Sequence, residues 1–159
     1  MCNPQWVSSA VEDIAPRTWS CSVARTVDVV GERWTVLILR EAFLGVRRFD
    51  QMTRHLGIAR NILSDRLGKL VEHGILERRQ YSERPPRFEY RLTEKGRDLY
   101  PIVVSLMSWG DKHLSTSGTP VELVHQDCGE VMQPHLACPK CGGAVHARNV
   151  RPQLGPGLS

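Results

Sequence analysis

Two short pairs of potential metal ligands near the C-terminal end are the residues best suited to chemistry. Two residues separate His125 from Cys128, two separate Cys138 from Cys141, and nine residues lie between the pairs. A two-residue spacing forms the short loop that lets both side chains point at one ion, and three thiolates with one imidazole make a closed structural zinc set. The sequence therefore predicts one structural Zn²⁺ ion per chain at these four residues.

Other interpretations of these residues stay open. The second pair alone would be a redox motif, but it lacks the strand–helix setting of such motifs and leaves the first pair unexplained. His135 and His146 are substitutes for His125 as the fourth ligand. A catalytic zinc is not expected, because four protein ligands leave no open position for water.

Positive charge is concentrated in the middle of the chain. The formal net charge is +4 and the pI is near 9.0. Residues 47–97 hold thirteen Lys and Arg against seven Asp and Glu, whereas residues 116–159 are neutral by the same count. A basic segment of this kind is typical of a surface that binds nucleic acid.

Other classes of protein are disfavoured by what the sequence lacks. The sequence shows no Ser, His and Asp in the order of a catalytic triad, no Gly-rich phosphate loop and no paired carboxylates. We therefore do not expect an enzyme. No apolar run is long enough to cross a membrane. Residues 1–16 have neither the basic nor the apolar region of a secretory signal, and the cysteines form no disulfide framework. We therefore expect a cytoplasmic protein.

Helical spacing of apolar residues dominates the first half of the chain. Four segments with this spacing, each followed by a glycine, are predicted helices: residues 19–30, 32–44, 49–56 and 59–73. Ser20 or Ser22 is expected to cap the first of them. The fourth places Leu63, Leu67 and Leu70 on one stripe, which should face the core.

After residue 74 the period changes. Residues 75–81 and 87–92 are predicted strands, joined by a hairpin tip with two prolines, and residues 94–114 are predicted to form one long helix. The predicted units are a loose arm (1–18), a main domain (19–115), a linker (116–120), a zinc-knuckle module (121–150) and a disordered tail (151–159).

This order of elements describes a winged helix-turn-helix, mainly α with a small β-hairpin wing, followed by a small zinc-ribbon-like module. The helix at 59–73 would enter the DNA major groove with its N-terminal polar residues at the base edges. Arg60 and Asn61 suit bidentate contacts with guanine and adenine, and a basic wing tip suits phosphates or the minor groove. The candidate DNA-binding residues are Arg48, Arg60, Asn61, Ser64, Arg66, Lys69, Arg84 and Arg87.

Five short motifs also occur in the order of a known family. They are CSVA at 21–24, VGERWTVLILR at 30–40, GVRRF at 45–49, PPRFEYRLTEKG at 85–96 and SWG at 108–110. Together they resemble the HxlR family of bacterial transcriptional regulators, relatives of the MarR group, over roughly residues 19–115. The resemblance implies a homodimeric winged-helix DNA-binding protein. Glu32 and Ala59 depart from it, since the family often has glycine and serine there.

The apolar content of the first and last helices of the winged domain also predicts a homodimer. These helices carry more apolar surface than one small domain can cover: Leu99, Ile102, Val103, Leu106, Met107 and Trp109 in the last, with Val23, Ala24 and Val27 in the first. Two reading helices would then address half-sites about 34 Å apart in a pseudo-palindromic operator. The alternative is that both helices only complete the monomer core.

Two further interpretations remain. The resemblance places Cys21 where several regulators of the family have a cysteine that senses electrophiles or oxidants, and a helix N-terminus favours the thiolate. Free cysteines are nevertheless usually buried and inert. The alternative function is a zinc-ribbon adaptor that binds protein without specific DNA binding, which should show little affinity for random duplex DNA.

Overall fold

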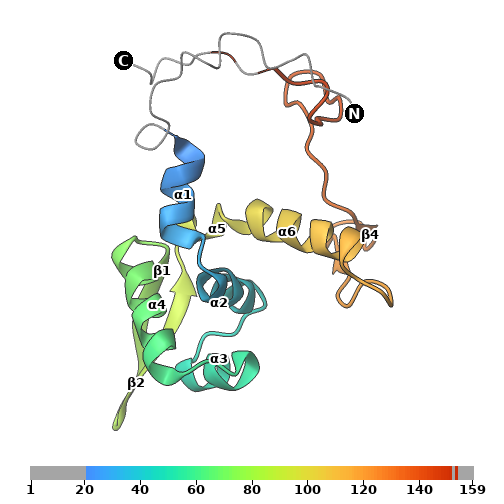
Figure 1. Cartoon of the computed structure of the whole chain (residues 1–159). Helices are drawn as coiled ribbons and strands as arrows, with labels where there is room; N and C mark the ends of the chain where they lie inside the picture. Colours follow the sequence, from blue (N-terminus) through green and yellow to red (C-terminus); the bar gives the residue numbers. More distant parts are fainter. Residues whose placement is uncertain (1–20, 152, 154–159) are drawn as a thin grey trace.

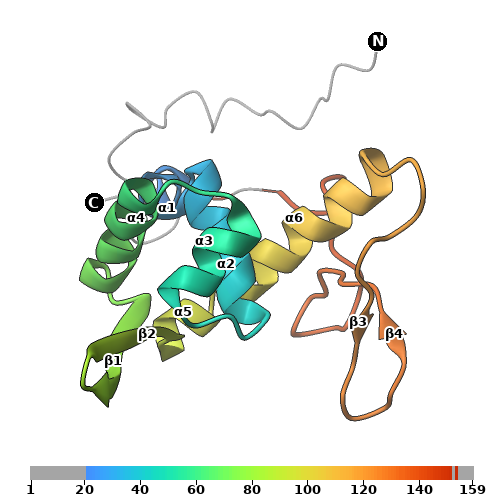
Figure 2. The same ribbon diagram turned by 90° about the horizontal axis from the view of Figure 1, so that it is seen from below.

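A computed structural model describes residues 21–151 and residue 153. The elements are, in order, α1 (Ser22–Val30), α2 (Arg33–Phe43), α3 (Phe49–Leu56), α4 (Arg60–Glu72), β1 (Leu76–Glu83), β2 (Pro86–Leu92), α5 (Glu94–Arg97), α6 (Tyr100–His113), β3 (Leu123–Val124) and β4 (Val131–Met132). The β1–β2 hairpin and the β3–β4 hairpin lie on opposite sides of the helical core (Figures 1 and 2). The fold is a winged helix-turn-helix with a C-terminal extension.

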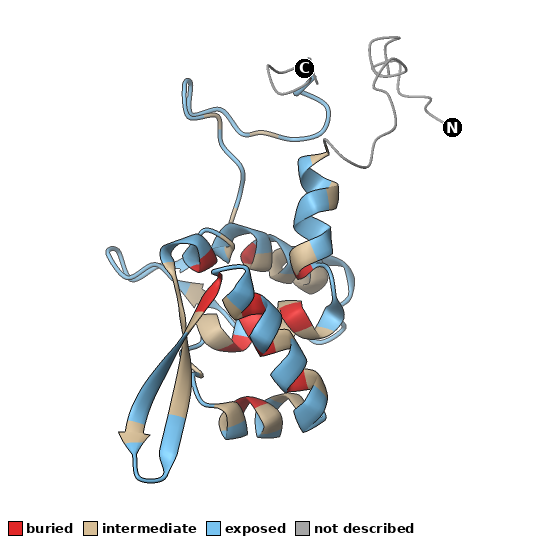
Figure 3. Ribbon diagram, turned by 90° about the vertical axis from the view of Figure 1, so that its left-hand side faces the viewer, coloured by how far each residue is buried: buried red, intermediate tan, exposed pale blue. Residues whose placement is uncertain are grey.

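The core lies between α2, α3, α4 and the base of β1, where the buried residues gather (Figure 3). Leu63, Leu67 and Leu70 are each at most 1% exposed and lie on one side of α4, as their spacing predicts. Ile38 of α2 and Met52 of α3 are fully buried against them. Each such side chain contributes roughly 1.5–3 kcal/mol of burial free energy, so the core fixes how α4 is rotated about its axis.

The bounds of the first four helices confirm the predicted pattern, with one wrong detail. The helix α3 has the predicted ends, and α2 and α4 begin and end within one residue of the expected positions. Ser22 is not the cap of α1, because Cys21 occupies that position and makes no side-chain capping bond. Ser22 is already helical, and its hydroxyl accepts a hydrogen bond from Arg25 at 3.3 Å. Ser20 and the predicted arm lie outside the described residues.

The predicted long helix at 94–114 is wrong, because the chain forms two helices there. Pro101 stands in the first turn of α6. Proline has no N–H to donate, and its ring clashes with the carbonyl four residues earlier in a continuous helix. Leu99 and Val103 pack against the core, whereas Leu106 is 52% exposed and does not share their environment.

The hairpin of β1 and β2 is longer than predicted and leaves the core as a wing. The strands pair in antiparallel register from Leu76 with Leu92 at the base to Glu83 with Pro86 at the tip, with an irregularity between Gln80 and Ser82. Leu76 is buried, whereas the residues around the tip are exposed. The wing is therefore anchored at one end only.

The C-terminal extension consists of two small hairpins. In the first, Leu123 pairs with Met132 and Val124 with Val131. In the second, Ala137 and Ala144 form a bridge, and the Val145 N–H donates to the carbonyl of Leu136 at 2.8 Å. Among the helices of the described chain, none combines the length and the apolar character needed to cross a membrane.

A buried carboxylate connects α2 to the helix-turn-helix. Glu41 is 4% exposed; its Oε1 accepts from the Arg40 guanidinium at 2.6 Å, and its Oε2 lies 2.8 Å from Nδ1 of His55 at the end of α3. Burial alone raises the pKa of Glu41, but the hydrogen bonds from His55 and Arg40 outweigh burial and lower the pKa below its ordinary value of 4.5. The carboxylate is therefore ionised and holds α3 against α2.

Glu41→Ala should lower the free energy of unfolding at pH 7 by about 1.5–3 kcal/mol, because the variant cannot form these charge-assisted hydrogen bonds. Since the folded-state pKa of Glu41 is depressed, its stabilisation is present above pH 4.5 and disappears as the pH falls through the folded-state pKa. Urea unfolding of wild type and variant at a series of pH values from 7 downward measures both effects. Glu72→Ala, an exposed change at the end of α4, is the control. A difference that does not shrink in acid would contradict the assignment.

Candidate nucleic-acid interface

The helix-turn-helix exposes one polar face of α4. Gly57, at φ 60°, ends α3 in the left-handed conformation that glycine tolerates, and α4 begins at Arg60. Because Leu63, Leu67 and Leu70 face the core, the opposite side of α4 faces solvent. Five of the residues there are exposed: Arg60, Asn61, Ser64, Asp65 and Lys69.

The contacts of Arg60 within the chain are weak enough for DNA to replace them. Its Nη1 lies 2.9 Å from Oδ1 of Asp50, and its guanidinium stacks over Phe49 at 4.9 Å from the ring centroid. The side chains of this ion pair are 69% and 75% exposed, so the pair contributes little stability. Ala59, the N-cap residue, makes no side-chain capping bond. The N-terminus of α4 therefore presents an arginine and uncapped backbone N–H groups, which favour anions.

Arg66 differs from the other candidates on α4. Its side chain is 18% exposed and pairs with Glu32, and its Nη1 lies 3.2 Å from Oδ2 of Asp65. Arg66 turns toward the start of α2 and is less accessible to DNA than the exposed candidates, so its DNA contact stays a prediction. Glu32, which departs from the family pattern, is its partner. Lys69 stays at the surface, 3.3 Å from Oδ2 of Asp65.

A hollow of about 610 Å³ lies between the helix-turn-helix and the wing. Arginines from three parts of the structure line it. They are Arg48 and Arg54 from the start and the body of α3, Arg60 from α4, and Arg78 and Arg87 from the wing. Ser64 also lines it. The hollow brings Arg48, Arg60, Ser64 and Arg87 together as one basic surface, while Arg84 stands exposed at the tip of the wing.

Aromatic rings support several of these arginines. The Arg78 guanidinium lies 3.6 Å from the centroid of Phe88, and that of Arg48 lies 4.7 Å from the centroid of Tyr81. Stacking keeps a guanidinium extended while its N–H groups stay free to donate. Sequence reasoning missed Arg54 and Arg78. The strand alternation placed Arg78 on one face of the wing, but did not indicate which face meets the helix-turn-helix.

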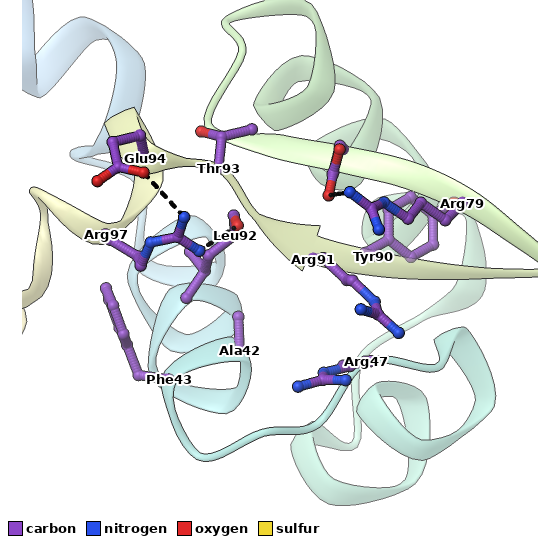
Figure 4. A pocket seen from close by; sticks show the side chains of 11 residues that line it. Ala42, Phe43, Arg47, Arg79, Tyr90, Arg91, Leu92, Thr93, Glu94 and Arg97 are labelled. Carbon is purple, nitrogen blue, oxygen red and sulfur yellow. Dashed lines mark hydrogen bonds and ion pairs between the residues drawn. The ribbon is translucent and has the colours of Figure 1, made fainter.

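A second hollow, of about 580 Å³, lies at the base of the wing between α2 and α5 (Figure 4). Three of its arginines are paired with carboxylates: Arg79 with Glu77 at 2.7 Å, Arg91 with Glu89 at 2.7 Å, and Arg97 with Glu94 at 3.0 Å. These pairs offset much of the positive charge. The first hollow is therefore the better site for a polyanion.

Cys21 is half-buried at the N-cap of α1. The nearby Arg25 directs its guanidinium to the Ser22 hydroxyl at 3.3 Å, and its backbone N–H donates to the carbonyl of Cys21 at 3.1 Å. The thiol is thus only partly buried, and redox sensing by Cys21 stays a prediction.

The two predicted ligand pairs each form a compact turn. Nδ1 of His125 lies 3.3 Å from Sγ of Cys128. In the second pair, hydrogen bonds from the backbone N–H groups of Lys140 and Cys141 lower the pKa of the Cys138 thiol, which favours the thiolate that zinc binds. Within the part of the chain that the structure describes, no three His, Cys, Asp or Glu side chains gather as a metal site. One chain thus forms both halves of the predicted site without joining them.

An exposed polar helix beside an arginine-lined hollow and a β-wing defines a winged helix-turn-helix DNA-binding protein. The chain belongs to the HxlR family, since the profile of the HxlR-like helix-turn-helix matches residues 29–118. It is a DNA-binding transcriptional regulator, as its relatives are. These relatives give no support to the adaptor interpretation.

Similar proteins extend the likeness beyond the winged domain. The HTH-type transcriptional regulator Rv3095 of Mycobacterium tuberculosis is 54% identical over 150 residues, which cover 94% of this chain and 95% of that protein. The crystal structure of PA1607, proposed to be a transcription factor, has a TM-score of 0.76 at 37% identity and covers 86% of this chain and 96% of that one. The redox regulator HypR in its oxidised form has a TM-score of 0.56 at 35% identity, with 60% and 100% covered.

Proposed function

We propose that the protein acts as a homodimer, placing α4 of each protomer in the major groove of a pseudo-palindromic operator and the wing on the backbone or minor groove. The observation that carries this proposal is the arginine-lined hollow shared by α3, α4 and the wing. Duplex DNA is the polyanion that fits such a surface, because its phosphates fix the register while the exposed end of α4 meets base edges.

The apolar surface of α1 and α6 supports the dimer. In α1 only Val30 is buried, and in α6 only Val104. The apolar side chains left at the surface of these helices are Val23 (71% exposed), Val27 (54%), Ile102 (43%), Leu106 (52%) and Trp109 (58%). A symmetry-related copy would cover them. This exposure argues against the alternative that both helices only complete the monomer core.

Two binding measurements test the proposed function. Protection mapping on DNA upstream of the neighbouring genes should reveal a site with two similar halves, one helical turn apart. Affinity for random duplex DNA should fall steeply with salt, because bound arginines release counterions. An adaptor protein would show neither protection nor a salt-dependent affinity.

Arg60→Ala or Asn61→Ala should each weaken operator binding by about 1–3 kcal/mol and relax the base preference. Both residues are exposed at the start of α4, where the reading helix meets base edges. Fluorescence anisotropy with operator and random duplexes measures both effects. Lys69→Ala, further along the same face, is the control for a phosphate contact and should weaken both duplexes alike. Equal losses on the two duplexes for Arg60→Ala and Asn61→Ala would mean that they contact phosphate only.

The wing arginines should supply affinity that does not depend on sequence. Removing both, in Arg84→Ala/Arg87→Ala, should lower the salt slope of DNA binding by about one for each arginine that binds a phosphate in the wild type. The matched control is Arg148→Ala/Arg151→Ala, which removes the same charge from exposed positions of the C-terminal extension. An unchanged slope in the wing variant would show that the wing points away from DNA.

Two further proposals concern regulation and structure. The pairs at His125 and Cys128 and at Cys138 and Cys141 are proposed to hold one structural Zn²⁺ per chain, since thiolates and imidazole are the ligands zinc prefers. Cys21 is proposed as a redox sensor, as the likeness to the redox regulator HypR suggests. Operator binding by Cys21→Ser, measured before and after treatment with the oxidant diamide, decides the second proposal. If Cys21 is the sensor, operator binding by this variant should no longer respond to diamide.

A further inference from the structure

Each proposed ligand pair lies at the tip of its own β-hairpin. His125 and Cys128 belong to the turn between β3 and β4, closed by the His125 N–H donating to the carbonyl of Glu130 at 2.9 Å. Cys138 and Cys141 belong to the second hairpin, closed by the Cys138 N–H donating to the carbonyl of Gly143 at 2.8 Å. The base of the second hairpin begins at Leu136, whose carbonyl accepts from the N–H of Val145. Both hairpins are thus complete in one chain while their tips stay apart.

The connector between the hairpins is short and extended. Only residues 133–135 lie between Met132, the last paired residue of the first hairpin, and Leu136, the first of the second. Pro134 fixes its own φ and holds Gln133 in an extended conformation. Three extended residues span about 10 Å. The chain runs straight from β4 to a separate second hairpin (Figure 1). Bringing both tips to one ion within a chain would require this connector to reverse direction.

Apolar side chains of both hairpins are uncovered. Val124 and Val131 of the first are each 54% exposed, and Leu136 of the second is 68% exposed. Two hairpins that pack face to face would cover these side chains as well as bring four ligands together. Each half of the proposed site therefore carries an uncovered apolar side chain of its own.

The first hairpin also lies beside the helix proposed to form the dimer. Met107 and Asp111 of α6 line one hollow together with Leu123 and Met132 of the first hairpin. In a dimer built on α6, this hairpin stands next to the partner subunit.

We propose that the zinc site is completed between two protomers: His125 and Cys128 of one bind the same Zn²⁺ as the partner's Cys138 and the partner's Cys141. This inference rests on the proposed zinc binding and on the proposed dimer. Exchange of identical elements is a low-cost route to a symmetric dimer, and a short, stiff hinge favours it. Two reciprocal sites form, so each dimer holds two ions and the ratio stays one per chain.

Co-expression of two differently tagged variants tests the exchange. One is His125→Ala/Cys128→Ser, which destroys the first pair, and the other is Cys138→Ser/Cys141→Ser, which destroys the second. Each homodimer should hold no zinc. The heterodimer, isolated with both tags and analysed for metal, should hold one ion, because the intact pair of each chain meets the intact pair of the other.

Each remaining outcome has one meaning. A heterodimer without zinc, when the wild type holds one ion per chain, would overturn the exchange and leave the proposed zinc site within one chain. Wild type purified without chelator and found to be zinc-free would overturn the zinc proposal itself. Wild type found as a zinc-loaded monomer would overturn the dimer and the exchange while keeping the metal. A second variant with four Gly and Ser residues inserted after Pro134 should close the site within one chain, so it should keep one ion per chain even when Val27→Glu/Leu106→Glu separates the protomers.

Discussion

The variant Val27→Glu/Leu106→Glu should become monomeric and bind its operator about 10²–10⁴-fold more weakly than the wild type. Both residues are more than half exposed on α1 and α6, the helices proposed to form the interface. A buried carboxylate without a partner is strongly unfavourable, so two per protomer should separate the subunits. Loss of the second reading helix removes the effective concentration that joins two half-sites, which accounts for the size of the effect.

Sedimentation and anisotropy measurements with EDTA present check this prediction, because the proposed metal bridge then contributes nothing to dimerisation. Val150→Glu is the control, since Val150 is 53% exposed in the C-terminal extension, outside α1 and α6. It should stay dimeric and bind as the wild type does. A double variant that remains a dimer, or a monomer with undiminished affinity, would place the interface elsewhere.

Local signals explain why much of the winged domain is predictable from the sequence. The bounds of α3 follow from a helical apolar pattern that ends at Gly57, and Leu63, Leu67 and Leu70 fix which face of α4 is buried. All of these features act within a few residues of one another. The opposite face of α4, which carries Arg60 and Asn61, must then be the exposed one.

The unpredicted features have two origins. Pro101 was visible in the sequence, and its missing N–H breaks the predicted long helix into α5 and α6. The ion pair that turns Arg66 away from the α4 surface was not visible, because Glu32 lies at the start of another helix. Arg54 and Arg78 were missed for the same reason, since only the packing of the wing beside α3 brings them to one hollow.

The zinc ligands show a further limit of what ligand spacing in the sequence can predict. Ligand spacing predicts two pairs, and each pair forms its turn as expected. It does not say whether one chain or two close the site, because that depends on how many of the nine intervening residues the hairpins use. Most of them are used, and three residues with Pro134 among them remain as the connector.

Removing zinc should unfold the C-terminal extension and spare the winged domain. No side chain in the described stretch 121–151 is buried, so the hydrophobic effect contributes little to holding the two hairpins in place. Structural zinc contributes about 10–16 kcal/mol in comparable small modules, and here it should supply most of the folding free energy. The winged domain has its own buried core on α2, α3 and α4, and should keep its helix content.

Hydrogen exchange before and after chelation measures this difference along the chain. Exchange should accelerate in residues 121–150, while the amides of α2 and α4 stay protected and the dimer persists through α1 and α6. Protein treated with chelator and then restored with Zn²⁺ is the control and should regain its protection. Metal retained by Cys138→Ser/Cys141→Ser would show that other residues bind it. Because the extension has no core to fall back on, unchanged exchange in zinc-free protein would mean that contacts with a partner subunit, and not the metal, keep it folded.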